Sequence, residues 1–289
     1  MPPADAPAAE RPAHAAGRPV LEVRGVAVHF GGVSALTDVS LSVAAGSVTG
    51  LIGPNGAGKT TLFNVVSGLQ APNSGTVTFE GRDLARMPPH RRARLGIART
   101  FQRLELFGTL TAEENVRVGL ESSIRWWQWR RLRASFPWAH DVSGDGARAA
   151  GSRVVSLADR LLAGVGLAGH EDQQSSAMPT GNARMVELAR ALAMQPKLLL
   201  LDEPGSGLDE HESEALGALL LQLAADGMAV LLVEHDMELV MRVCDRVHVL
   251  DFGHVVASGS PDEIRADPRV QTAYLGAPSG GARPPGGGR

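Results

Sequence analysis

Residues 48–61 read VTGLIGPNGAGKTT, a short apolar run followed by a glycine-rich loop. The loop, residues 53–61, matches the P-loop pattern of a glycine, four residues, a second glycine, a lysine and a hydroxyl residue. Glycines in such a loop let backbone N–H groups surround phosphate oxygens, and the helix that follows adds partial positive charge. The stretch therefore predicts a phosphate site between a strand and a helix; the alternative is a glycine-rich turn that binds nothing.

Two side chains of the loop have predicted roles of their own. Lys59 can reach the β- and γ-phosphates of a nucleotide, and the Thr60 hydroxyl can ligate Mg²⁺. Lysine is otherwise rare, since only Lys197 joins Lys59 in the chain. The predicted nucleotide-binding residues of the loop are Gly53, Asn55, Gly56, Gly58, Lys59, Thr60 and Thr61.

Beyond the loop, apolar strands alternate with helices, which predicts an α/β fold with a largely parallel core sheet. Residues 100–180 interrupt the alternation with a more polar and mostly helical segment, so we expect a helical insertion in a split core. The ends, residues 1–19 and 276–289, are rich in proline, alanine or glycine and are expected to be disordered.

The bulk composition excludes several classes of protein. The 289 residues carry a net charge of −3, which gives no basic footprint for nucleic acid. Cys244 is the only cysteine, so no internal disulfide can form, and the nine histidines show no metal-ligand spacing. No apolar stretch approaches the length of a membrane-spanning helix, and the N-terminus lacks the apolar region of a secretory signal.

A second strand end supplies carboxylates. Residues 198–204 read LLLLDEP, in which four leucines predict a strand buried on both faces, with Asp202 at its carboxyl end. Asp202 is the expected partner of Mg²⁺, and Glu203 is placed to polarise a water toward the γ-phosphate. The alternative is that the two carboxylates cap the next helix.

Two further polar residues, His235 and Gln102, indicate a function only when they are considered together with the other motifs. His235 follows the strand in VLLVEHD, residues 230–236, where it could donate a hydrogen bond to a phosphoryl oxygen. Gln102 ends a short apolar segment in ARTFQR, residues 98–103. Taken alone, the histidine is structural and the glutamine is a solvated polar residue.

Together these motifs resemble the ATP-binding cassette of an ABC transporter over residues 20–275, in the order of that family. The resemblance implies a P-loop NTPase fold with an N-terminal antiparallel β part and a helical subdomain at about 103–182. It implies ATP and Mg²⁺ as ligands, with Thr60, Gln102 and Asp202 organising the metal. The implied catalytic residues are Glu203, His235 and Gln102. Phe30 lies where the family places an aromatic that stacks on adenine.

Three longer stretches narrow the resemblance: FGGVSALTDVSLSV, ARTFQRLELFGTLTAEENV and GHVVASGSPDEIRADPRVQTAYLG. They are similar to the ATPases of branched-chain amino-acid importers, and the insertion fits the longer of the two ATPases in such systems. The resemblance implies a peripheral subunit on the cytoplasmic side of the membrane, with a second ATPase subunit, two transmembrane permease subunits and a substrate-binding protein. The ATPases of amide or urea importers and of lipopolysaccharide exporters share much of this sequence.

The sequence MPTGN, residues 178–182, stands where the family has leucine, serine, two glycines and glutamine before a helix. In the family this motif closes over the ATP held by the opposite subunit. Pro179 offers neither a hydroxyl nor an N–H, and Thr180 replaces a glycine, so Gly181 and Asn182 are the remaining ligand candidates. Asn182 is also expected to cap the helix. The change predicts a heterodimer with one strong and one weak site; the alternative is a turn that tolerates substitution.

All four tryptophans lie in the predicted insertion, within RWWQWRRLRASFPW, residues 125–138. We rank packing inside the helical part first, contact with a membrane or partner second, and stacking on nucleic-acid bases a distant third. Two rival functions also stay open. One is a regulatory nucleotide-binding subunit with little turnover, and the other is an ABC ATPase that acts on DNA or ribosomes, which normally has two cassettes or long coiled coils.

Overall fold

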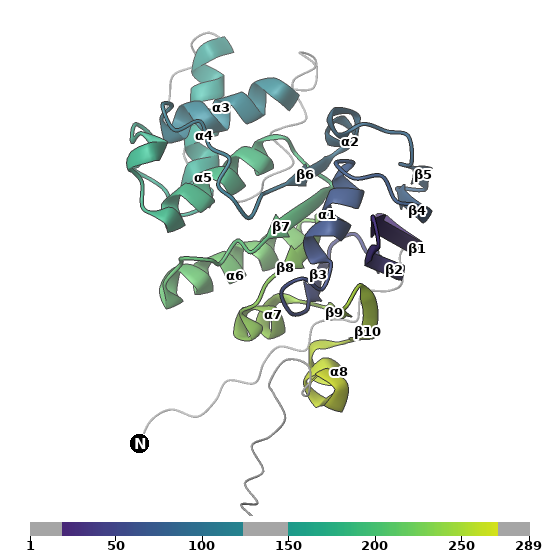
Figure 1. Ribbon diagram of the computed structural model, residues 1–289. Coiled ribbons are helices and arrows are strands. Elements are labelled where there is room, and N and C mark those ends of the chain that lie inside the picture. Colours follow the sequence, from purple (N-terminus) through teal and green to yellow (C-terminus); the bar gives the residue numbers. More distant parts are fainter. Residues whose placement is uncertain (1–18, 124–149, 271–289) are drawn as a thin grey trace, which may run out of the picture.

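The computed structural model of the protein describes residues 19–123 and 150–270 and contains two β-sheets (Figure 1). The smaller sheet is antiparallel, with the strand order β2-β1-β4-β5. Its strands are β1 (Leu21–Phe30), β2 (Val33–Val43), β4 (Ser74–Phe79) and β5 (Arg82–Asp83). This sheet is the N-terminal antiparallel part that the family resemblance implies.

The larger sheet has six strands in the order β10-β9-β3-β8-β7-β6, and every neighbouring pair is parallel except β9 and β10. Its strands are β3 (Val48–Ile52), β6 (Ile97–Arg99), β7 (Leu198–Asp202), β8 (Ala229–Val233), β9 (Arg246–Asp251) and β10 (His254–Gly259). All residues of β3, β7 and β8 are buried, as expected for parallel strands covered on both faces. The predicted α/β fold with a mostly parallel core sheet is confirmed.

The helices divide into two groups. One group accompanies the sheets: α1 (Lys59–Ser67), α2 (Pro89–Leu95), α6 (Glu210–Ala225), α7 (Met237–Val243) and α8 (Pro261–Ala266). The other comprises α3 (Ala112–Ser123), α4 (Ala150–Gly164), the 3₁₀ turn η4 (Ser175–Ala177) and α5 (Thr180–Ala193). Figure 1 shows α3, α4 and α5 gathered away from the antiparallel sheet, with α3 packed against both others.

Several sequence expectations lie outside the described residues. The tryptophan-rich stretch with Trp126, Trp127, Trp129 and Trp138 falls there, as do most of both predicted tails. Within residues 19–123 and 150–270, no helix is both long and apolar enough to span a membrane.

A buried arginine fastens the end of α1 to its neighbours. The Arg92 guanidinium donates from Nη1 to the carbonyl oxygens of Val65 (2.7 Å) and Val66 (2.9 Å), and from Nη2 to that of Leu84 (2.7 Å). Its Nε donates to the Met87 carbonyl oxygen at 2.7 Å. The last carbonyls of a helix have no partner within the helix, so Arg92 satisfies groups that α1 cannot satisfy itself.

We predict that Arg92→Met lowers the free energy of unfolding by about 3 kcal/mol, because the carbonyl oxygens of Val66 and Met87 lose the donor that Arg92 supplies. The exposed neighbour Arg91 is the matched control, and Arg91→Met should change stability by less than about 0.5 kcal/mol. Urea denaturation of both variants measures the difference. Equal losses in the two would show that Arg92 does not anchor this helix end.

Candidate functional site

The predicted P-loop lies between β3 and α1, and its lysine is drawn back onto it. Lys59 Nζ donates to the carbonyl oxygens of Gly53 at 2.5 Å and Pro54 at 3.0 Å. Burial lowers the pKa of Lys59, while the nearby charges of Glu203 and Asp202 oppose that shift. The ammonium group therefore stands at the loop, facing two carboxylates, in a position to turn toward an incoming phosphate.

Two glycines of the loop are required by close backbone packing. Gly58 has φ +108°, and a Cβ there would lie 2.5 Å from the Ala35 carbonyl oxygen. At Gly53 a Cβ would lie 2.0 Å from the Leu250 carbonyl oxygen. Any side chain at either position would push the loop away from β2 or β9, so these glycines hold the loop against both sheets.

A cavity of about 230 Å³ opens over the loop. It is lined by Ala35, Asn55, Gly56, Gly58, Lys59, Thr60, Thr61, Gln102 and Glu203. Gln102 Nε2 donates to Glu203 Oε2 at 3.2 Å, although the two residues are 101 positions apart. The structure thus brings most of the predicted loop residues together with the glutamine and the glutamate.

Asp202 lies beside this cavity but is buried, with 2% of its side chain exposed. Its Oδ2 accepts from Arg99 Nη2 at 3.2 Å. Arg99 Nη1 also donates to Asn64 Oδ1 of α1 at 2.7 Å, and the guanidinium lies 4.8 Å from the centre of the Phe101 ring. Burial raises the pKa of Asp202 and the Arg99 charge opposes the rise. Arg99 therefore joins Asp202 to the helix that follows the P-loop.

Glu203 occupies an unusual backbone conformation, with φ +53°, in the left-handed region. Its N–H donates to the Val233 carbonyl oxygen at 2.9 Å, and its own carbonyl accepts from Ser206 N–H at 3.2 Å. Non-glycine residues in this region cost free energy and persist where their surroundings enforce them, often at functional sites. The turn aims the Glu203 side chain at the cavity, and α6 is capped by Asp209 instead. The alternative that Asp202 or Glu203 caps the helix is therefore wrong.

His235 and Phe30 are among the predicted site residues that lie outside the cavity lining. His235 follows β8, which stands between β3 and β7 in the sheet, and 68% of its side chain is exposed. Phe30 ends β1 and is 51% exposed. Both side chains are accessible to a ligand that extends beyond the cavity.

The turn at residues 178–182 lies apart from the P-loop cavity, at the start of α5. Pro179 is the N-cap residue, no side chain caps the helix, and Asn182 lies in the first turn. The predicted capping by Asn182 is wrong because the helix begins at Thr180, where the fixed φ of the preceding proline suits a helix start. A Cβ at Gly181 would lie 3.0 Å from Leu208 Cδ2, so this glycine permits close packing on the segment before α6.

The oxygen groups near the P-loop suit a hard divalent cation. Thr60 offers a hydroxyl, Gln102 an amide and Asp202 a carboxylate, which are ligand types that Mg²⁺ accepts. Among the described residues, no group of three or more histidines, cysteines or carboxylates is arranged as a metal cage. The arrangement fits a metal bound jointly by protein oxygens and phosphate oxygens rather than by the protein alone.

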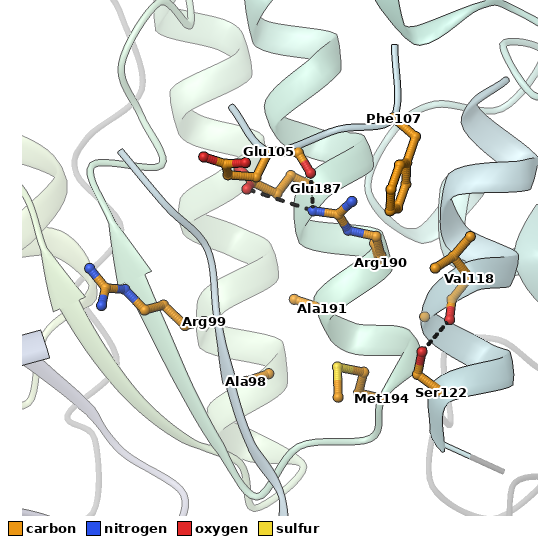
Figure 2. A pocket seen from close by; sticks show the side chains of 11 residues that line it. Ala98, Arg99, Glu105, Phe107, Val118, Ser122, Glu187, Arg190, Ala191 and Met194 are labelled. Atoms are coloured by element: carbon orange, nitrogen blue, oxygen red, sulfur yellow. Dashed lines mark hydrogen bonds and ion pairs between the residues drawn. The ribbon is translucent and has the colours of Figure 1, made fainter. Parts of the chain in front are cut away.

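A second cavity, of about 330 Å³, lies between α3, α5 and the segment after β6 (Figure 2). Arg190 Nη2 of α5 donates to the Glu105 carbonyl oxygen at 2.6 Å, and its guanidinium lies 5.7 Å from the centre of the Phe107 ring. Glu187 also approaches Arg190, at 3.9 Å. The same connecting segment carries Gln102 into the first cavity, so one loop borders both.

The sequence analysis missed four residues that position the groups around the P-loop cavity: Arg99, Arg184, Glu187 and Glu234. Arg184 donates from Nη2 to the Gln102 carbonyl oxygen at 3.2 Å and from Nε to the Ser206 carbonyl oxygen at 2.8 Å. Glu187 accepts from Phe101 N–H at 3.5 Å. Glu234 has a signal in the sequence, because it is a charged residue directly after an apolar strand. The others have no local signal, because their partners are distant in sequence.

Comparison with known proteins gives consistent matches. Residues 36–206 match the family described as ABC transporter, and residues 254–279 match the one described as Branched-chain amino acid ATP-binding cassette transporter. The high-affinity branched-chain amino acid transport ATP-binding protein LivG of Salmonella typhimurium is 38% identical over 260 residues, which cover 90% of this chain and 98% of that protein.

Solved structures agree with these sequence matches. A nucleotide-free ATP-binding cassette from an ABC transporter has a TM-score of 0.75 at 28% identity, covering 90% of this chain and all of that one. A dimeric cassette in a post-hydrolysis state, bound to ADP and phosphate, has a TM-score of 0.68 at 26% identity, covering 83% of this chain and 98% of that one.

We predict that Arg99→Met lowers the free energy of unfolding by about 3–5 kcal/mol at neutral pH, because it leaves Asp202 buried without its cation. The loss should grow with pH. In the variant the folded Asp202 keeps its proton above the ordinary pKa of 3.8 while the unfolded chain releases it, so stability falls as pH rises through that interval. Denaturation at several pH values measures this slope.

The matched control is Arg103→Met, since Arg103 is exposed. It should change stability by less than about 0.5 kcal/mol and follow the pH profile of the wild type. An Arg99→Met profile parallel to the wild type would contradict the assigned pairing.

Proposed function

Since this chain belongs to the ABC transporter family of ATP-binding proteins, we propose that it is the ATP-hydrolysing subunit of an importer for branched-chain amino acids. The observation that carries the activity is the cavity in which the P-loop, Gln102 and Glu203 face one another. The substrate class rests on the match of residues 254–279 and on the name of the relative that this chain resembles along nearly its whole length.

The residues divide the work of hydrolysis by position. Lys59 and the loop N–H groups hold the phosphates, as a P-loop does. Glu203 polarises the attacking water, and Gln102, hydrogen-bonded to it, helps to place that water. His235 donates to the γ-phosphate as charge develops, and Phe30 stacks on the adenine.

Mg²⁺ is the metal that accompanies ATP in this proposal, and when bound it neutralises charge on the phosphate oxygens. Thr60, Gln102 and Asp202 would hold it. Asp202 also stays paired with Arg99, so its carboxylate has a fixed orientation before nucleotide binds.

A second cassette completes each site in this proposal. The turn at 178–182 lies apart from the chain's own P-loop cavity, and a dimeric cassette is among the similar solved structures. Pro179 cannot donate an N–H, and the turn has no serine to meet a phosphate. The dimer is therefore a heterodimer, in which a better-equipped partner closes over this chain's ATP and Gly181 and Asn182 contact the partner's nucleotide weakly.

The membrane partners are two permease subunits, and a soluble binding protein delivers the substrate. The chain sits on the cytoplasmic side of the membrane, without contact to nucleic acid. The cavity of Figure 2 offers the permease a half-apolar recess with the exposed Phe107 at its edge. Because one loop borders both cavities, a permease bound in the cavity of Figure 2 would contact the same loop that carries Gln102.

A regulatory subunit with little turnover is the second candidate, and the altered turn is the observation that favours it. The complete set of Lys59, Gln102, Glu203 and His235 favours hydrolysis instead, because a chain that only senses nucleotide has no need of a base at the γ-phosphate. Relatives that move amides, urea or lipopolysaccharide remain the alternative for the transported substrate.

We predict that Glu203→Gln lowers kcat for Mg²⁺-ATP hydrolysis by at least about 100-fold, because it removes the general base. Nucleotide affinity, measured with a fluorescent ATP analogue, should stay within about threefold because the P-loop is untouched. Glu210→Gln, an exposed glutamate at the start of α6, is the matched control and should keep full activity. Hydrolysis by Glu203→Gln within tenfold of the wild type would assign the base elsewhere.

The altered turn is tested by repair. We predict that Pro179→Ser with Thr180→Gly raises ATP hydrolysis by the isolated chain about 10- to 100-fold, the effect of one restored charge-assisted hydrogen bond. Hydrolysis is measured against the chain's own concentration. Wild-type activity that rises more steeply than linearly with concentration, and is unchanged by the repair, would mean that the turn works as it stands and that no unequal partner is needed.

A further inference from the structure

A buried carboxylate joins the two strand ends that carry the catalytic groups. Glu234 follows β8 and is 1% exposed. Its Oε1 accepts from Gly205 N–H at 2.6 Å, and its Oε2 accepts from His235 N–H at 3.0 Å. Asp236 contributes a third backbone hydrogen bond. The carboxylate therefore links the turn after β7 to the turn after β8.

These N–H groups belong to segments with roles in hydrolysis. Gly205 lies two residues after Glu203, within the turn that keeps Glu203 at φ +53°. His235 and Asp236 form the turn that presents the imidazole, and His235 Nδ1 lies 3.6 Å from Glu234 Oε2. Removing the Glu234 carboxylate would thus free both turns, the one after β7 that holds Glu203 and the one after β8 that holds His235.

Gly205 itself fits this contact closely. A Cβ at position 205 would lie 2.8 Å from Glu234 Oε1 and 3.6 Å from Leu239 Cδ2. The absence of a side chain lets the N–H approach the carboxylate to hydrogen-bond distance. The contact is therefore built from both sides, by a buried acid on β8 and a glycine on the turn after β7.

The hydrogen-bond partners of Glu234 agree with this role. Burial raises the pKa of Glu234, and the three backbone donors with the His235 charge oppose that rise. The hydrogen-bond partners of Glu234 are backbone N–H groups, so its carboxyl group works as an acceptor. A carboxylate can accept from donors on both oxygens, whereas an amide of the same shape can accept on only one.

We infer that Glu234 is a positioning residue for ATP hydrolysis, which holds Glu203 in its left-handed turn and His235 beside it through one shared carboxylate. The inference rests on the proposed function for its catalytic consequence. The N–H groups that Glu234 accepts from belong to Gly205, His235 and Asp236 rather than to the P-loop, so we expect nucleotide binding to be independent of it. Its loss should therefore lower kcat and leave KM unchanged.

The experiment compares Glu234→Gln with Asp245→Asn in the full chain. Asp245 is the matched control because its Oδ2 accepts from Val48 N–H at 2.9 Å, at the start of β3 and away from the P-loop end. Glu234→Gln should lower kcat about 10- to 100-fold with KM for ATP within twofold, and Asp245→Asn should keep kcat within twofold. Equal kcat losses in the two variants, or an unchanged kcat in Glu234→Gln, would overturn the inference.

A second variant reaches the same contact from the other side. Gly205→Ala should lower kcat to a similar degree with Glu234 intact, and the double variant should be no slower than the slower single one, because both remove one interaction. Additive losses would show that Glu234 and Gly205 act separately and would overturn the inference.

Amide hydrogen exchange keeps the inference apart from the proposed function. In Glu234→Gln at least one of the amides of Gly205 and His235 should exchange at least tenfold faster, because glutamine can accept from only one of them, with core strand amides unchanged. If the chain binds nucleotide but neither the wild type nor the variant with the repaired turn hydrolyses it, the proposed function fails. Amide exchange then tests by itself whether Glu234 holds the two turns. Unchanged exchange at both amides would overturn the role of Glu234.

Discussion

The parallel register of β3, β8 and β7 is the constraint on which the site depends. Leu51 of β3 and Asp202 of β7 both pair with Val233 of β8, so the three strands end at one level. The P-loop, the histidine turn and the glutamate turn all begin from that level. A slip of two residues in either pairing would move one group by roughly 7 Å, further than one hydrogen bond can span.

The parts of this arrangement that could be predicted from sequence are those with local signals. Buried runs such as LLLLD define strands by composition, and the P-loop defines its own strand and helix. The pairing of Arg99 with Asp202 spans 103 residues and that of Gly205 with Glu234 spans 29, so each depends on which strands become neighbours. The sheet order β8-β7-β6 decides this, and no short pattern encodes it. The prediction that Asn182 caps α5 is wrong for a local reason, since Pro179 is the N-cap residue and the helix begins at Thr180, two residues before Asn182.

Helix α5 connects the regions that our proposal assigns to a nucleotide and to a membrane partner. Its first turn carries the altered motif, Arg184 reaches the carbonyl oxygens of Gln102 and Ser206, and Arg190 reaches that of Glu105. The contacts with Gln102 and Glu105 hold the loop after β6 in place between the two cavities. If a ligand in one cavity changes the affinity of the other cavity through this loop, a ligand in the other cavity must change the affinity of the first by the same factor, because coupling between two binding sites is reciprocal.

The left-handed backbone of Glu203 carries a consequence for how such a chain can change over generations. A glycine at this position would adopt φ +53° freely, whereas glutamate holds it at a cost of about 1–2 kcal/mol. Stability alone gives position 203 no reason to keep a glutamate, so in our proposal selection for hydrolysis keeps it there. In a descendant that no longer hydrolysed nucleotide, position 203 should be among the first to drift, while the tightly packed glycines of the P-loop stay.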